Sequence, residues 1–167
     1  TAVARFGGRI VVGIDAKNGY AAAEGWTQTS DVYFTDLAKS MEQCGVQTII
    51  FTDISKDGTL TGPNLKQLEE INHAVSCDII ASGGITDIKD IKALQSLGLY
   101  GAICGKSIYS GSLDLKQALE VAHPRRDSGT RHGAGAYACL YEQGIPEKNA
   151  GNRLYLVLVQ KQAGALE

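Results

Sequence analysis

The sequence predicts an α/β fold with a mostly parallel sheet, because strand-like and helix-like segments alternate along residues 9–122. The strand-like segments are short apolar runs without a polar face, which is typical of strands covered on both sides. The connections between them are only a few residues long. Such a repeat forms either a flat, doubly wound sheet or part of a (β/α)8 barrel, whose usual length is about 250 residues, and periodicity does not choose between the two.

The first predicted strand is residues 9–15 (RIVVGID), an apolar run that ends in Asp15. Lys17-Asn18-Gly19 predicts a turn, and residues 20–26 are expected to form a short segment outside the strand–helix pattern before the next helix. A helix should follow, with N-cap candidates at residues 29–31 and an end at Gly45.

The second strand is predicted where residues 48–51 (TIIF) precede Thr52 and Asp53. A polar loop follows, in which Lys56-Asp57-Gly58-Thr59 predicts a tight turn. Pro63 and Asn64 end the loop, and a helix is expected over residues 64–75. A strand end that opens into a polar loop before a helix is where α/β proteins keep their chemistry.

Two further strand–helix units are predicted. Their elements are a strand at residues 78–82, a helix at 87–97 capped by Thr86, a strand at 99–104, and helices at 106–109 and 114–121.

The sequence changes character after residue 122. Residues 123–153 are rich in Gly, Arg and small residues, which predicts loop or disorder. Residues 154–159 (LYLVLV) are a strong strand candidate that should pair with a sheet edge or another chain, because an exposed segment of this kind promotes aggregation. We therefore expect one half-barrel domain at residues 1–122 and an atypical tail at residues 123–167.

The composition excludes several function classes. The 167 residues carry a formal net charge of −2, which gives no reason to expect nucleic acid or an anionic membrane as a partner. No apolar run approaches the roughly 20 residues that span a bilayer, and no signal-like N-terminus is present. The four cysteines lack metal-ligand spacing, so we expect no metal and assign three of them to the apolar core. These features predict a soluble, cytoplasmic protein.

Glycines follow two consecutive predicted strands. Gly83 and Gly84 follow residues 78–82, and Gly105 precedes Lys106 after residues 99–104. Glycines here let backbone N–H groups approach an anion, and adjacent loops of this kind form phosphate sites in barrels. A single Gly-Gly pair more often serves a tight turn, but two such sites on neighbouring strands favour a phosphate site. Lys106 is either a phosphate ligand or a solvent-facing residue.

Polar residues mark the ends of the first two strands. Asp15 fits a general acid or base as well as it fits a solvated residue at a strand end. Thr52 belongs either to the core or to the site. Asp57 is placed to bind a substrate hydroxyl or to orient Thr52, although Asp-Gly in a turn is more often structural.

Three segments together resemble a known family. They are RIVVGIDAKNGYAAAEGW, FTDISKDGTLTGPN, and IIASGGI with AICGKSIYSG. In order and spacing they resemble the C-terminal half of the phosphoribosylformimino-aminoimidazole-carboxamide ribotide isomerases of histidine biosynthesis. The resemblance implies a (β/α)8 TIM barrel and an Amadori rearrangement, aminoaldose to aminoketose, of a substrate with a phosphate at each end. The cyclase subunit of imidazole glycerol phosphate synthase shares the half-barrel ancestry and ranks second.

The resemblance also implies roles for individual residues. Asp15 matches the general acid at the end of the fifth barrel strand, and Thr52 and Asp57 match assisting residues at the sixth. The residues that match substrate-binding positions are Trp26, Gly58, Gly83, Gly84, Gly105 and Lys106. Moving a proton from C2 to C1 after ring opening needs an acid and a base on opposite sides of the sugar and no cofactor.

The chain departs from the family in two ways. The first four strand–helix units and the general-base aspartate on the first of them have no counterpart, and residues 123–167 resemble nothing in the family. We therefore expect little activity from this chain alone. A complementary N-terminal half-barrel is one expected partner. The alternative is a phosphate-ligand-binding module that homodimerises, because an open half-barrel exposes two sheet edges and an apolar interior.

Overall fold

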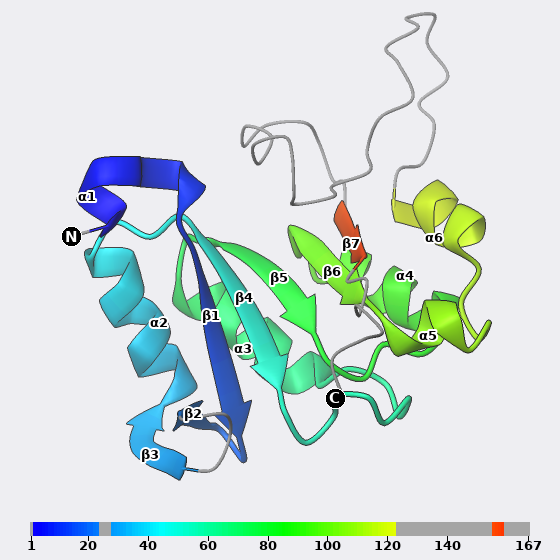
Figure 1. The fold of residues 1–167 in the computed structure, drawn as a ribbon, viewed down its shortest axis with the longest axis horizontal. Coiled ribbons are helices and arrows are strands. Elements are labelled where there is room, and N and C mark those ends of the chain that lie inside the picture. The colour runs from blue at the N-terminus through cyan, green and yellow to red at the C-terminus, as the bar shows by residue number, and fades with distance from the viewer. Residues whose placement is uncertain (1, 24–27, 123–154, 159–167) are drawn as a thin grey trace, which may run out of the picture.

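The computed structural model describes residues 2–23, 28–122 and 155–158, which form one sheet with helices (Figure 1). The strands are β1 (Val11–Lys17), β2 (Tyr20–Ala23), β3 (Gln28–Tyr33), β4 (Thr48–Asp53), β5 (Asp78–Ser82), β6 (Gly101–Cys104) and β7 (Tyr155–Leu158). The helices are α1 (Ala2–Phe6), the 3-10 turn η1 (Gly7–Arg9), α2 (Phe34–Gln43), α3 (Leu65–Ala74), α4 (Ile88–Ser96), α5 (Lys106–Tyr109) and α6 (Leu115–Ala122).

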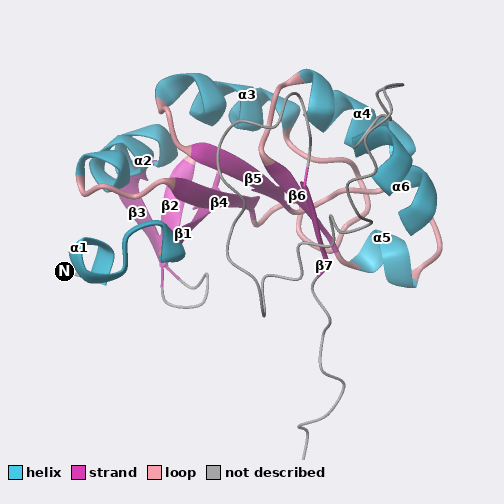
Figure 2. Cartoon of the chain, turned by 90° about the horizontal axis from the view of Figure 1, so that it is seen from above, coloured by secondary structure: helices cyan, strands magenta, loops and turns pink. Residues whose placement is uncertain are grey.

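The strand order decides between a doubly wound sheet and part of a (β/α)8 barrel, which periodicity could not distinguish. The sheet runs β3-β2-β1-β4-β5-β6-β7, and β1, β4, β5, β6 and β7 are parallel. These parallel strands follow chain order without the reversal that defines a doubly wound sheet. In addition, α2, α3, α4 and α6 lie along one face of the sheet (Figure 2). The described sheet is open, and its one-sided helix layer fits part of a (β/α)8 barrel, as expected.

The hydrophobic core lies between the sheet and this helix layer. Alternate strand residues, among them Ile14 of β1 and Phe51 of β4, point into it and are 1% exposed. Phe51 packs against Phe34 at the start of α2, with ring centroids 4.9 Å apart. The strand residues that alternate with these core residues therefore point to the opposite face of the sheet, which is the barrel interior of a (β/α)8 fold.

The predicted N-cap at residues 29–31 is wrong, because these residues belong to strand β3. β2 folds back on β1 through a turn at Asn18 and Gly19, and β3 pairs with β2. The Ser30 hydroxyl donates to the Ala21 carbonyl across this hairpin at 2.9 Å instead of capping a helix. Helix α2 begins later, at Phe34, without a side-chain cap. Pairing of β3 with β2 thus outweighed the local capping preference.

The predicted cap of the α4 helix is also wrong by one residue. Asp87 is the N-cap, and its carboxylate accepts from the backbone N–H groups of Lys89 and Asp90 at 2.8 and 3.4 Å. The Thr86 hydroxyl instead donates to the Gly84 carbonyl at 2.8 Å and accepts from Gly62 N at 3.2 Å. Thr86 therefore joins two loops at the end of the sheet.

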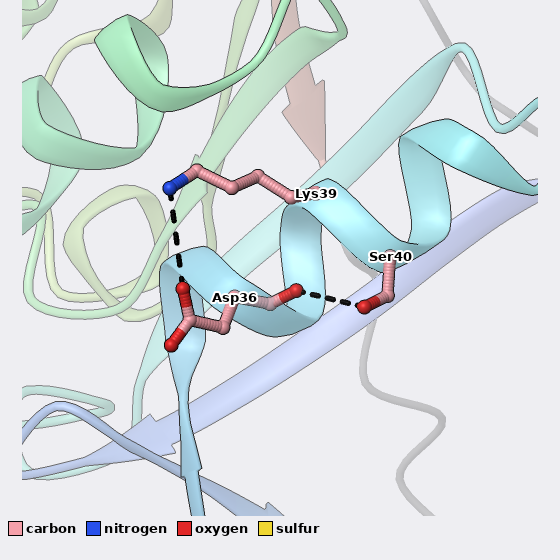
Figure 3. Close-up of polar contacts among 3 residues, drawn as sticks. All are labelled: Asp36, Lys39 and Ser40. Atoms are coloured by element: carbon pink, nitrogen blue, oxygen red, sulfur yellow. Dashed lines mark hydrogen bonds and ion pairs between the residues drawn. The ribbon is translucent and has the colours of Figure 1, made fainter.

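An exposed group of polar contacts lies on α2 (Figure 3). Lys39 Nζ lies 3.9 Å from the Asp36 carboxylate, and the Ser40 hydroxyl donates to the Asp36 carbonyl at 3.0 Å. An exposed ion pair three residues apart on a helix contributes only about 0.2–0.5 kcal/mol. Within the described residues, no helix is long and apolar enough to cross a membrane.

The cysteines differ in their surroundings. Cys77 and Cys104 are buried, as predicted, whereas Cys44, the C-cap residue of α2, is exposed. Cys139 lies outside the described residues. Burial and, secondarily, the Asp90 carboxylate raise the pKa of Cys104 from 9.0 to about 12.

The raised pKa predicts slow alkylation of Cys104. At pH 8 we expect iodoacetamide to modify Cys44 quickly and Cys104 only after unfolding, because the buried thiol stays protonated. Peptide mapping by mass spectrometry measures both rates, and equal rates in the folded chain would contradict the prediction. Since the folded thiol holds its proton more tightly than the unfolded one, its contribution to stability is present below pH 9. That contribution decreases as the pH rises towards 12.

Candidate active site

Three polar side chains form a row across the parallel strands. Asp15 of β1 is the register partner of Thr52 of β4, and Thr52 is the partner of Ser82 of β5. Their neighbours Ile14 and Phe51 point into the helix-covered core, so the row lies on the opposite face. Asp15 is half-buried and Thr52 is 8% exposed. The structure thus brings Asp15 and Thr52 together, with Ser82 as a neighbour that the sequence did not single out.

Asp53 organises the loop that follows β4. Its side chain is 5% exposed and accepts hydrogen bonds from both ends of the loop. One carboxylate oxygen accepts from the Ser55 hydroxyl at 2.6 Å and from Ser55 N at 3.0 Å. The other accepts from Asn64 Nδ2 at 2.7 Å, and the Asn64 side chain also caps α3. Sequence reasoning missed this role, although a carboxylate at a strand end eleven residues before a helix cap was a signal.

We expect Asp53→Asn to loosen this loop. An amide accepts through one oxygen only, so either Asn64 or Ser55 would face an NH₂ donor. A buried, unsatisfied donor costs about 1–3 kcal/mol. Urea denaturation should show this loss, whereas the matched change Asp36→Asn on the exposed face of α2 should be nearly neutral. Equal stability of the two variants would contradict the prediction.

The loop after β4 lies against Gly83 and Gly84 of the loop after β5. A Cβ on Gly83 would come within 2.9 Å of the Asp53 carbonyl and 3.4 Å of Asp57 N. A Cβ on Gly84 would collide with the Gly62 carbonyl. Gly62 N also donates to the Gly84 carbonyl at 3.0 Å. Both glycines have positive φ, +95° and +81°, which favours glycine independently of the space. They therefore have a structural role as well as a predicted one in phosphate binding.

Lys106 joins a third loop to the same end of the sheet. Its ammonium group donates to the Gly58 carbonyl at 2.6 Å and is exposed. Gly58 lies beside Asp57 in the predicted tight turn, where Thr59 N donates to the Lys56 carbonyl. The lysine thus positions the turn that carries Asp57, while its role as a phosphate ligand stays a prediction.

Gly105 differs from the other two glycines. A Cβ built on it meets no atom within 4 Å, and its φ of −109° is available to any residue. Packing within the described chain therefore does not require glycine at this position.

The structure brings together eight of the nine predicted site residues at the carboxyl ends of β1, β4, β5 and β6. They are Asp15, Thr52, Asp57, Gly58, Gly83, Gly84, Gly105 and Lys106. Trp26 lies outside the described residues. Among the described residues, no group of three or more His, Cys, Asp or Glu side chains is placed to hold a metal ion.

Comparison with known families gives the same assignment as the motifs. A family model described as "Histidine biosynthesis protein" matches residues 1–114. The chain belongs to the histidine biosynthesis protein family. This confirms the family that the three segments indicated.

Curated members of this family include close relatives of the chain. An isomerase of Clostridium botulinum (strain Kyoto) is 54% identical over 120 residues, which are 72% of this chain and 50% of the relative. A Listeria welshimeri relative has the same identity and coverage. One from Bacillus cereus is 56% identical over 113 residues, 68% of this chain and 47% of the relative. All three are named 1-(5-phosphoribosyl)-5-((5-phosphoribosylamino)methylideneamino) imidazole-4-carboxamide isomerase.

The chain spans about half the length of the curated relatives it matches. Their names agree with the isomerase assignment and not with the cyclase alternative. The similarity therefore places residues 1–114 in a family of isomerases of histidine biosynthesis.

Proposed function

We propose that residues 1–122 form the half of a histidine-biosynthesis isomerase that carries the general acid. The substrate class is a ribotide with two phosphates, since the names of the relatives contain two phosphoribosyl groups. The observation that carries the proposal is the pairing of Asp15 with Thr52 in register, beside loops held together by Gly83 and Gly84.

The proposed reaction is an Amadori rearrangement of an aminoaldose to an aminoketose. Asp15 donates a proton to the ribose ring oxygen, which opens the ring, and a base on the opposite side moves a proton from C2 to C1. Thr52 lies next to Asp15 and assists it. Asp57, in the turn held by Lys106, binds a substrate hydroxyl. By family resemblance the base comes from an N-terminal half-barrel.

The phosphate nearer to this half is proposed to bind at the loops after β5 and β6. Backbone N–H groups of Gly83, Gly84 and Gly105 are the proposed donors, because glycine allows close approach to an anion. Gly105 supports this proposal, since packing gives no other reason for glycine there. A cytoplasmic location remains a prediction from the composition.

The test is a mixing experiment. We expect the isolated chain to form little aminoketose from the aminoaldose, and the addition of the N-terminal half of the Clostridium botulinum isomerase to restore turnover. Product formation is followed by chromatography. Clear turnover by the isolated chain would contradict the expectation that its base comes from an N-terminal half-barrel. If the two halves were shown to bind but gave no turnover, the proposed function would be contradicted.

A further inference from the structure

The β6 edge of the sheet is covered by a strand from the far end of the same chain. β7 pairs in parallel with β6 over four register positions, from Gly101 opposite Tyr155 to Cys104 opposite Leu158. Figure 1 shows β7 beside β6 at this edge of the sheet. The chain passes through a helix on one face of the sheet between β1 and β4, between β4 and β5, and between β5 and β6.

The pairing satisfies backbone groups of β6 that no other described strand can reach. Tyr100 N donates to the Ile79 carbonyl of β5 at 3.0 Å. Because successive N–H groups of a strand point to opposite neighbours, Ala102 N–H points to β5, while Gly101 and Ile103 N–H point to β7. Without β7 these groups would form an unpaired parallel edge, which attracts strands of other chains.

The sequence of the covering segment gives an independent reason for pairing. Residues 154–159 (LYLVLV) contain no charged residue, no proline and no glycine. A six-residue segment with this composition has high strand preference and associates with other chains when left exposed. The β6 edge and β7 are therefore two association-prone features, and each one covers the other.

We propose that β7 is an edge cap that the chain supplies to its own β6, and that it keeps a second copy of the chain from pairing there. A strand edge bonds to one neighbour at a time, so any strand that joins β6 from another chain must first displace β7. The same competition applies to a half-barrel that would close a barrel through β6. The edge cap acts independently of isomerase activity.

Amide hydrogen exchange on the full-length chain tests the cap directly. We expect Gly101 and Ile103 to be about as protected as Ala102 in the unmodified chain. The variant Leu156→Pro/Val157→Pro removes two successive N–H donors, one of which must face β6. In this variant, the amides of Gly101 and Ile103 should exchange at least roughly tenfold faster than in the unmodified chain, while those of Ala102 and Phe51 stay protected. Ala163→Pro, a proline outside β7, is the matched control and should behave as the unmodified chain.

Sedimentation velocity over a range of protein concentrations supplies the second measurement. The unmodified chain and Ala163→Pro should sediment as monomers, and the double proline variant should self-associate. Fast exchange of Gly101 and Ile103 in the unmodified chain overturns the proposal without any variant. Dimerisation of the unmodified chain through β7, or a double variant that remains monomeric with protected Gly101 and Ile103, overturns it as well.

Discussion

Replacing Asp15 with Asn is expected to lower kcat by roughly 10²–10⁴-fold in the barrel completed by the Clostridium botulinum half. The amide keeps the size and most of the hydrogen-bonding capacity of the carboxyl group but cannot donate a proton to the ring oxygen. Asp15 is half-buried in the row with Thr52, so its replacement should leave the hydrophobic core intact. The loss should therefore appear in kcat more than in KM.

The matched control for this experiment is Asp31→Asn. Asp31 is an exposed carboxylate on β3 that belongs to neither the site nor the core. Its replacement should leave kcat unchanged, and both variants should bind the complementary half as the unmodified chain does. Retention of full turnover by Asp15→Asn would remove Asp15 from the proposed mechanism.

Gly84→Ala is expected to destabilise the chain by about 2–6 kcal/mol. The left-handed backbone at φ +81° costs a non-glycine residue about 1–3 kcal/mol. The new Cβ would also collide with the Gly62 carbonyl, and backbone atoms cannot rotate away as a side chain can. Overpacking of this kind costs about 1–3 kcal/mol more. Urea denaturation followed by circular dichroism measures the change.

Gly105→Ala is the matched control, because it adds the same methyl group to a glycine of the same proposed phosphate site. Its Cβ meets no atom within 4 Å and its φ of −109° lies outside the left-handed region, so stability should fall less than in Gly84→Ala. Its effect should instead appear as weaker binding of the phosphorylated substrate by calorimetry. If Gly105→Ala destabilised the chain as much as Gly84→Ala, the structural distinction between the two glycines would be wrong.

Several elements followed from local sequence alone. β4, β5 and α5 agree with the strand predicted at residues 48–51 with Thr52 and Asp53 at its end, the strand at 78–82 and the helix at 106–109. Apolar runs bounded by turn residues leave few alternatives. The N-caps at residues 29–31 and at Thr86 were wrong. Hydroxyl and carboxylate side chains can satisfy either a helix end or a neighbouring loop, and pairing partners distant in sequence decided which.

The same limit applies to the site. An α/β repeat places the carboxyl ends of its strands at one edge of the sheet. The structure has Asp15, Thr52 and the glycines of the two loops at this edge, as predicted. Local sequence could not show that Asp53 accepts from Ser55 and Asn64 at once, or that Lys106 donates to a carbonyl 48 residues away. Such contacts depend on which loops lie beside each other.

The sequence by itself determined the family, the order of the strand–helix units and the residues at the rim, because motifs and hydrophobic periodicity are local properties. The tertiary structure decided that the units lie in barrel order with helices on one face. It also decided that β2 pairs with β1 and β3 with β2, and that β7 pairs with β6. These features depend on backbone hydrogen bonds between segments far apart in the chain, and which segments pair is settled by the whole sheet.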